Sequence, residues 1–329
     1  MRPGRGRGTA MSGTAREEVW VLADPRAGTA AQALGIAERL GWPFRTVPLE
    51  WSALAAFPLA WPSLAGLAPA ARGMVAPPWP GLVISAGRRS APVSRWLRRR
   101  GARTVHCMRP GVAAEDFDLL VIGRHDGPTP APNVLPILGA THRVSPAVLA
   151  AARAEWPALE ALPRPRVAVL LGGAVRGEGL DPAEALAIVE RVIPAAGSIL
   201  ATTSRRSGAA VGEALVRRLE GVPGHLHRWG MPGPNPYAAF LALADAVVVT
   251  GDSVSMLSEA LATTAPVFIA GAPPGARRHR ALHASLIAVG QAVSLDRFPQ
   301  APPRTPLDES GRVAAVLHEG LLRGGAAGG

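Results

Sequence analysis

The sequence contains no lysine and few aromatic residues. All 35 basic residues are therefore arginine, and aromatics make up 5% of the chain. This bias, with 37 glycines and 33 prolines, is typical of GC-rich codon usage, so the net charge of +11 is weak evidence for a polyanionic partner. Because no module that combines aromatic and basic residues is recognisable, we predict that nucleic acid is not a partner.

Cysteine is nearly absent as well. The single Cys107 excludes intramolecular disulfides and cysteine-based metal sites, which suits a reducing cytoplasm. It lies in the apolar run from Thr104 to Met108, which predicts a core thiol on a buried strand. We therefore expect a cytoplasmic protein that binds no metal.

Charge is missing from Trp51 to Ala71, which raises the question of membrane contact. Three prolines, Pro58, Pro62 and Pro69, interrupt this segment and argue against a membrane-spanning helix. We expect a short helix-and-loop insertion, and peripheral contact with the inner face of a membrane stays open. Residues 1–16, rich in glycine and arginine, are expected to form a disordered leader.

What is present indicates two globular domains. The chain has 329 residues, of which 48% are hydrophobic and 18% charged. Short apolar runs alternate with helical patterns, as in parallel βαβ units. We predict an α/β protein with two Rossmann-like domains that face each other across a cleft. The predicted domains cover residues 17–157 and 158–306, and a C-terminal helix and tail covers 307–329.

The loops after strands are the candidate sites, because ligands of parallel sheets bind at the carboxyl ends of strands. In the first domain, one loop runs from Asp24 through Gly28 and Thr29 to Gln32. It lacks a GxGxxG pattern, and a capped tight turn is the alternative. A second loop holds His125 and Asp126, candidates for a general base. Adjacent residues of an extended chain point in opposite directions, so a structural role stays open.

Three loops of the second domain are rich in groups that bind anions. Gly172 and Gly173 follow a buried strand, as do Ser204, Arg205 and Arg206. The third and strongest signal is a buried strand that runs into a hydroxyl-rich turn and a helix. Its candidates are Thr250, Asp252, Ser253, Ser255 and Glu259. The alternatives are a solvated edge for the arginines and simple helix capping by Asp252 or Ser253.

These motifs resemble a known family. The motifs that carry the resemblance are Asn235-Pro236-Tyr237, Ala244-Asp245, Thr250 to Met256, Ser258-Glu259-Ala260, Asp24 to Gln32, Gly87-Arg88-Arg89, Phe117-Asp118, His125-Asp126, Asn133-Val134, Gly139-Ala140, Gly172-Gly173 and Ser204-Arg205-Arg206. Together they are similar to the plant ELONGATED MITOCHONDRIA mitochondrial-fission family and its bacterial members. The resemblance spans nearly the whole chain from Val19, and it adds Arg88 to the first-domain loop residues.

The second domain also resembles GT-B glycosyltransferases. That resemblance implies that Gly172 and Gly173 approach the diphosphate of a nucleotide sugar, that Ser253 and Ser255 donate to it, and that Glu259 accepts from ribose hydroxyls. This sequence departs at Asp252, whose carboxylate would repel a diphosphate unless Arg205 or Arg206 compensates or the carboxylate turns away to cap the helix.

The leading hypothesis is therefore a GT-B-type glycosyltransferase that binds a nucleotide-diphosphate sugar, with UDP-linked sugars as candidates, in the cleft between domains. It would need no metal or other cofactor, and His125 or Asp126 would be the base. One alternative is a non-catalytic binding or scaffold protein that acts at a membrane surface or on a protein partner. A second alternative is a nucleotide-sugar epimerase on a GT-B fold. The sequence leaves open whether the protein is an enzyme.

Overall fold

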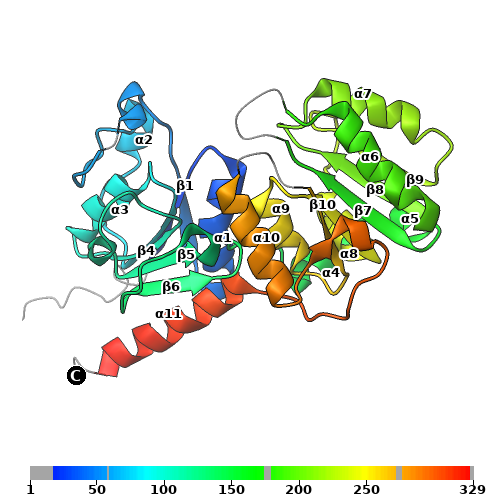
Figure 1. The fold of residues 1–329 in the computed structure, drawn as a ribbon. Coiled ribbons are helices and arrows are strands. Elements are labelled where there is room, and N and C mark those ends of the chain that lie inside the picture. Colours follow the sequence, from blue (N-terminus) through cyan, green and yellow to red (C-terminus); the bar gives the residue numbers. More distant parts are fainter. Residues whose placement is uncertain (1–17, 58, 174–178, 272–275, 327–329) are drawn as a thin grey trace, which may run out of the picture. The chain divides into compact units, whose positions relative to one another are not determined.

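The computed structural model describes residues 18–57, 59–173, 179–271 and 276–326. The chain divides into two compact units, each built around one six-stranded sheet. Unit 1 contains the described residues up to Val121 and residues 131–134, and unit 2 contains residues 122–130 and the chain from Leu135 onward. Figure 1 traces both sheets and their helices. The domain boundary predicted at residue 157 stays a prediction, and the helix at 146–155 clusters with unit 2.

The sheet of unit 1 has the strand order β2-β1-β3-β4-β5-β6. Its strands are β1 (Val19–Ala23), β2 (Phe44–Pro48), β3 (Leu82–Ala86), β4 (Arg103–Cys107), β5 (Leu119–Gly123) and β6 (Val134–Ile137). The helices before β5 are α1 (Ala27–Leu40), η2 (Ala53–Ala56), α2 (Pro69–Gly73), α3 (Ala91–Arg98) and η3 (Ala114–Asp116). The apolar run at 104–108 is β4, and Cys107 is buried, as predicted.

The sheet of unit 2 has the order β12-β11-β10-β7-β8-β9, and all its neighbouring strands are parallel. Its strands are β7 (Arg166–Leu171), β8 (Ser198–Thr203), β9 (Gly224–His227), β10 (Ala246–Thr250), β11 (Val267–Ala270) and β12 (Val293–Ser294). Its helices are η4 (Arg124–Asp126), α4 (Pro146–Glu155), α5 (Pro157–Glu160), α6 (Pro182–Val192), η5 (Ile193–Ala195), α7 (Ala209–Arg218), α8 (Tyr237–Leu243), α9 (Val254–Ala260), α10 (Arg277–Ala288), η6 (Leu295–Arg297) and α11 (Glu309–Ala326).

Apolar side chains on both faces of the central strands form the core of unit 2. Every residue of β7 and β10 is buried, and one face of these strands packs with Leu257 and Phe240 while the other packs with Ile188 and Phe268. A continuous run of β-branched and apolar residues is what a strand covered by helices on both faces requires. The predicted α/β, Rossmann-like fold of each unit is confirmed.

In both sheets the strand order changes direction at an interior strand. In unit 1 the chain moves from β1 outward to β2 and then continues on the other side of β1 with β3. In unit 2 it moves from β7 through β8 to β9 and then continues on the other side of β7 with β10. The loops after β1 and β3, and those after β7 and β10, therefore border the crevice in which open α/β sheets bind ligands.

Several elements were not expected from the sequence. The segment from Trp156 to Arg166 contains three prolines, which predicts a linker, but it includes the short helix α5 and ends at the first residue of β7. The short strands β9 and β12 and the helix α10 were not predicted. The uncharged segment from Trp51 holds η2 and α2, and none of the described helices is long and apolar enough to cross a membrane.

Candidate functional site

A buried carboxylate joins three strand-end loops of unit 2. Asp252, which follows β10, is 6% exposed and accepts a hydrogen bond from the backbone N–H of Gly173 at 2.8 Å. The guanidinium of Arg206 lies 3.3 Å from the same oxygen. These contacts connect the loops after β7, β8 and β10. From the sequence, the charge of Asp252 could be compensated by Arg205 or Arg206, or the carboxylate could turn away to cap the helix. In the structure Arg206 compensates it.

Helix capping falls to the neighbouring serine. The hydroxyl oxygen of Ser253 accepts from the N–H of Met256 and begins α9, as serine at this position commonly does. Ser253 is buried and Ser255 is half-buried. Asp252 is thus free to face the loop after β7 instead of the helix.

The two glycines after β7 already use their N–H groups within the protein. Gly172 donates to the hydroxyl of Thr250 at 2.7 Å, and Gly173 donates to Asp252. A Cβ atom on Gly172 would lie 2.5 Å from an Asp252 oxygen, and one on Gly173 would lie 2.0 Å from the carbonyl oxygen of Arg206. Glycine is required here so that the three loops can approach each other. Whether these residues contact a phosphate stays a prediction.

The turn after β8 is ordered by its own serines. Ser207, at the end of this loop and outside the list of predicted site residues, donates to the carbonyl of Leu171 at 2.8 Å and accepts from the N–H of Ser204 at 2.9 Å. Ser204 accepts in turn from the N–H of Arg206. Arg205 points to solvent, whereas Nη1 of Arg206 is buried and has no hydrogen-bond partner among the described residues. The turn therefore offers two cationic side chains to an anion.

Two histidines of α10 complete the cluster, and the sequence prediction missed both. His283 is buried, and its Nε2 lies 2.7 Å from the carbonyl oxygen of Gly251. Burial lowers the pKa of His279, and the nearby charge of Asp252 and a hydrogen bond with the Asp252 backbone oppose that shift in part. The spacing of four residues was the available signal, because it places both histidines on one face of a helix.

The candidate bases His125 and Asp126 lie in η4, against α10 of the same unit. Both side chains are buried, with 2% and 5% exposure, and the His125 ring lies 3.9 Å from the Asp126 carboxylate. That carboxylate instead accepts from the guanidinium of Arg278 at 2.7 Å. Burial lowers the pKa of His125 to about 4, so its ring is neutral at neutral pH. Arg278, missed by the sequence prediction, holds the carboxylate as an ion pair.

Glu259 pairs with a tyrosine from α8. The hydroxyl of Tyr237 donates to Glu259 at 2.5 Å. Burial raises the pKa of Glu259 to about 7, although the hydrogen bond from Tyr237 acts in the opposite direction. Burial and the neighbouring carboxylate also raise the pKa of Tyr237. Glu259 thus changes its charge near neutral pH.

An open pocket adjoins the loop after β8. It is lined by Thr203, Ser204, Arg205, Gly208, Arg228 and Trp229, among others. The indole of Trp229 is 61% exposed, and its backbone N–H donates to the hydroxyl of Thr203 at 2.9 Å. An exposed aromatic ring beside arginines is suited to a flat aromatic group that carries phosphates.

In unit 1 the loop after β1 is closed by its own aspartate. Asp24 accepts from the N–H and the guanidinium of Arg26 at 2.9 Å and from the indole of Trp51 at 3.2 Å. Thr29 and Gln32 are buried and Gly28 is exposed. Burial raises the pKa of the Asp24 carboxyl, but the hydrogen bonds and charge of Arg26 outweigh it, so the net pKa is lowered.

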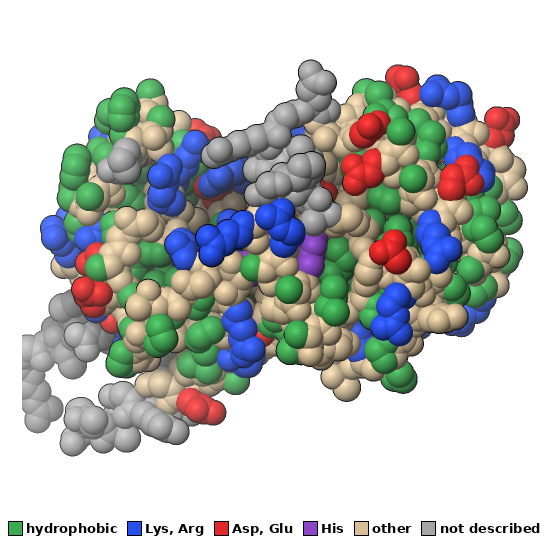
Figure 2. All heavy atoms as spheres, in the orientation of Figure 1, with side chains coloured by type: hydrophobic (Ala, Val, Ile, Leu, Met, Phe, Trp, Pro, Cys, Tyr) green, Lys and Arg blue, Asp and Glu red, His purple; other side chains and the backbone are tan. Residues whose placement is uncertain are grey.

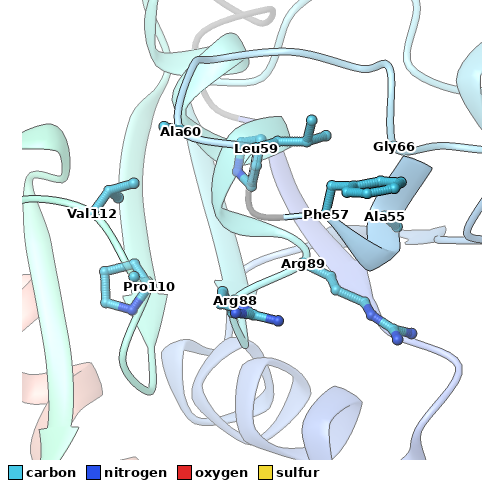
Figure 3. Close-up of a pocket in the computed structure, with 11 residues that line it drawn as sticks. Ala55, Phe57, Leu59, Ala60, Gly66, Arg88, Arg89, Pro110 and Val112 are labelled. Carbon is cyan, nitrogen blue, oxygen red and sulfur yellow. The ribbon is translucent and has the colours of Figure 1, made fainter.

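Arg88 follows β3, the strand next to β1 in the sheet of unit 1. It lines a pocket with Arg89 and apolar residues. In Figure 3, Pro110 and Val112 lie on one side of this pocket and Phe57 on the other, with the two arginines along the lower edge. Among the described residues, no group of three or more histidine, cysteine, aspartate or glutamate side chains is placed to hold a metal ion.

Comparison with solved structures shows the fold. UDP-GlcNAc 2-epimerase from Neisseria meningitidis, bound to UDP-GlcNAc, is similar with a TM-score of 0.57 and 13% identity over 93% of this chain and all of that one (100%). The kitacinnamycin glycotransferase is similar with a TM-score of 0.51 and 14% identity over 92% of this chain and 98% of that one. At such identities the likeness concerns architecture alone, and the fold is GT-B-like.

Comparison of sequences shows the family. The Arabidopsis thaliana mitochondrial fission protein ELM1 is 30% identical over 222 residues, which are 59% of this chain. The match spans 52% of the Arabidopsis protein, about half of its length. The family model described as mitochondrial fission ELM1 matches residues 27–321. The resemblance expected from the motifs is confirmed, and this chain belongs to the mitochondrial fission ELM1 family.

Proposed function

We propose that unit 2 binds a nucleotide-diphosphate sugar at the carboxyl ends of β7, β8 and β10, and that the protein is a GT-B-type glycosyltransferase. The observation that carries the proposal is the Asp252–Arg206 arrangement. It brings two arginines and an open pocket with Trp229 to the loops beside the point where the sheet changes direction. The nucleotide sugar in the structurally similar epimerase from Neisseria meningitidis supports the choice of ligand class.

Different side chains contact the diphosphate, the base and the ribose of the ligand. Arg205 and the unpaired Nη1 of Arg206 face the diphosphate, because the N–H groups of Gly172 and Gly173 are used internally. The base stacks on Trp229. Glu259, held by Tyr237, accepts from a ribose hydroxyl when it is ionised. The leaving diphosphate is stabilised by arginine without a metal ion.

Thermal shifts against UDP, GDP, CDP, ADP and their sugars test this proposal. A ligand at about one hundred times its Kd stabilises the folded state by about 2.7 kcal/mol, which raises Tm measurably. We expect one nucleotide to stabilise selectively, and Arg205→Ala and Glu259→Ala to reduce the shift. Arg217→Ala, which removes an exposed arginine from α7, is the matched control and should keep it. If no nucleotide shifts Tm at millimolar concentration, the proposal fails.

A binding protein without turnover is the second candidate. The observation that favours it is the state of the proposed bases: Asp126 is ion-paired with Arg278, and His125 is buried and neutral. Nucleotide binding without release of free nucleotide from its sugar, over hours and with varied acceptors, would support this candidate over the transferase.

An epimerase is the third candidate, favoured by the likeness to a UDP-GlcNAc 2-epimerase. It predicts formation of the 2-epimer when UDP-GlcNAc alone is incubated with the protein, which NMR detects directly. A transferase instead requires an acceptor and leaves the sugar configuration at carbon 2 unchanged.

A further inference from the structure

The exposed large hydrophobic side chains of unit 1 are confined to one segment. Among the described residues of this unit they are Leu54, Phe57, Trp61 and Met74, with 51%, 66%, 60% and 37% exposure. We call these four residues the apolar ridge. Figure 2 shows hydrophobic side chains gathered on the end of unit 1 that carries α2 in Figure 1, with arginines beside them. Single exposed hydrophobic residues need no explanation, but a group of this kind marks a contact surface.

Hydrogen bonds hold the backbone of the ridge in place. Ser52 donates to the carbonyl of Gly66 at 2.9 Å, next to an antiparallel bridge between Trp51 and Leu67. Arg95 of α3 donates to the carbonyl of Ala60 at 2.6 Å. The segment is therefore anchored to itself and to α3, and its aromatic side chains reach solvent although the backbone beneath them is bonded.

The sequence stretch that carries the ridge is basic. Residues 51–114 contain nine arginines and no aspartate or glutamate. Arg88 and Arg89 are exposed, line the pocket beside Phe57 and Leu59, and make no hydrogen bond or ion pair with another described residue (Figure 3). Two other arginines of the stretch, Arg95 and Arg98, pair with Asp116 and Asp118. The unpaired positive charge next to the pocket is therefore that of Arg88 and Arg89.

We propose that this surface docks on a membrane that contains anionic lipids. The apolar ridge enters the boundary between headgroups and acyl chains, and Arg88 and Arg89 hold a lipid phosphate at the pocket. Aromatic and aliphatic side chains next to arginine are the combination that such an interface binds. A nucleic acid would contact the arginines and stack on the aromatic rings, but it would leave the aliphatic side chains of Leu54 and Met74 without an apolar partner. The inference does not rest on nucleotide binding, because every residue involved belongs to unit 1.

Co-sedimentation of the full chain with lipid vesicles tests the inference. We expect binding to vesicles of phosphatidylcholine with phosphatidylglycerol, weak binding to phosphatidylcholine alone, and loss of binding as salt is raised. Arg88→Gln with Arg89→Gln should weaken binding to anionic vesicles by about tenfold or more, since each arginine near such a surface contributes about 1 kcal/mol. Phe57→Ser with Trp61→Ser should weaken it by a similar factor on both vesicle types.

Matched controls come from unit 2. Ile287 and Val289 are exposed to a similar degree, 46% and 52%, so Ile287→Ser with Val289→Ser should bind vesicles like the wild type. Unchanged Tm values would show that all variants fold. The inference is overturned if the wild type does not sediment with anionic vesicles, if both double variants of unit 1 bind like the wild type, or if the surface binds RNA and no vesicle.

Discussion

Each unit has a buried aspartate directly after a central strand, and the two differ in what they connect. Asp24 and Asp252 are 4% and 6% exposed, and both accept from a backbone N–H group and face an arginine. The arginine and N–H partners of Asp24 both come from Arg26, two residues away. Those of Asp252 come from Gly173 and Arg206, on the loops after β7 and β8.

The difference shows that a buried aspartate can hold together residues that are close in sequence or residues that are distant in sequence. Asp24 closes one turn and, through Trp51, steadies the start of the segment after β2. Asp252 contacts two other loops that are far from it in sequence. It acts together with the bonds from Gly172 to Thr250 and from Ser207 to Leu171, so the candidate site of unit 2 is held by long-range contacts, whereas the loop after β1 in unit 1 is held mainly by contacts of shorter range.

Glycine substitutions in these loops should give the largest difference in stability between the two units. Gly173→Ala places a methyl group where the carbonyl of Arg206 lies, so the loops must separate, and we expect a loss on the order of 4 kcal/mol in the free energy of unfolding. Gly87→Ala, in unit 1, meets Thr29 at 3.0 Å with a φ of +84°, and we expect a loss of about 2 kcal/mol. Urea unfolding measures both.

Gly320→Ala is the control for these substitutions. Gly320 lies in α11 with open space around its Cβ position, so alanine should stabilise the helix by about 0.5–1 kcal/mol. Equal losses at Gly173 and Gly87 would contradict the idea that the loops of unit 2 are the more tightly interlocked.

Removal of each aspartate should have a smaller and unequal effect. Asp252→Ala leaves the Gly173 N–H and the Arg206 guanidinium without their acceptor, which we expect to cost about 3 kcal/mol. Asp24→Ala should cost about 1–2 kcal/mol, because Arg26 is half exposed and water replaces part of the interaction.

The pH dependence of Asp24 gives a second readout. The lowered pKa of Asp24 means that its contribution is present above the unfolded pKa, near 4, and is lost as pH falls below that range. Wild type and Asp24→Ala should therefore converge in stability at acidic pH. Convergence at alkaline pH instead would contradict the lowered pKa.

Glu259→Gln should have an effect that depends on pH. The pKa of Glu259 is raised to about 7 in the folded state, so ionisation at higher pH costs stability, which is fully present only below the unfolded pKa near 4.5. Glutamine stays neutral and still accepts from Tyr237. The variant should gain on the order of 2 kcal/mol relative to wild type between pH 5 and pH 8, measured by urea unfolding.

Tyr237→Phe sharpens this test. It removes the hydrogen bond that opposes the raised pKa, so the folded-state pKa of Glu259 should rise further. The loss of stability with rising pH should still begin near the unfolded pKa, but it should continue to a higher pH and be larger than in the wild type. If Glu259→Gln tracks the wild type at every pH, the carboxyl does not titrate near neutrality.

Local patterns predicted the fold well. The buried runs that became β7 and β10, and the serine cap before α9, are set by adjacent residues. The strands β9 and β12 were missed because they are short and lie at the edges of their sheet, where no continuous apolar run is needed. The helix α10 was missed because three of its first four residues are arginines and the apolar pattern is weak.

The candidate site was harder to predict because its contacts are long-range. The sequence identified the loops after β7, β8 and β10, but it assigned the glycine N–H groups to a ligand, and in the structure Thr250 and Asp252 accept from them. The partners Arg278, His279 and His283 come from a helix whose place against these loops no local pattern reveals. His125 and Asp126 were proposed on chain position alone, without knowledge of Arg278.

The assignment of residues 122–134 to the two units has a practical consequence. The chain leaves unit 1 after Val121, returns to it for residues 131–134, and enters unit 2 again at Leu135. No single cut of the gene therefore yields both halves intact, because a fragment that ends at 121 loses β6 and one that begins at 135 loses η4, which holds Asp126 against Arg278. Separate expression of the halves would require residues 122–137 in both fragments, because β6 ends at Ile137, and two-fragment complementation is the natural way to study them.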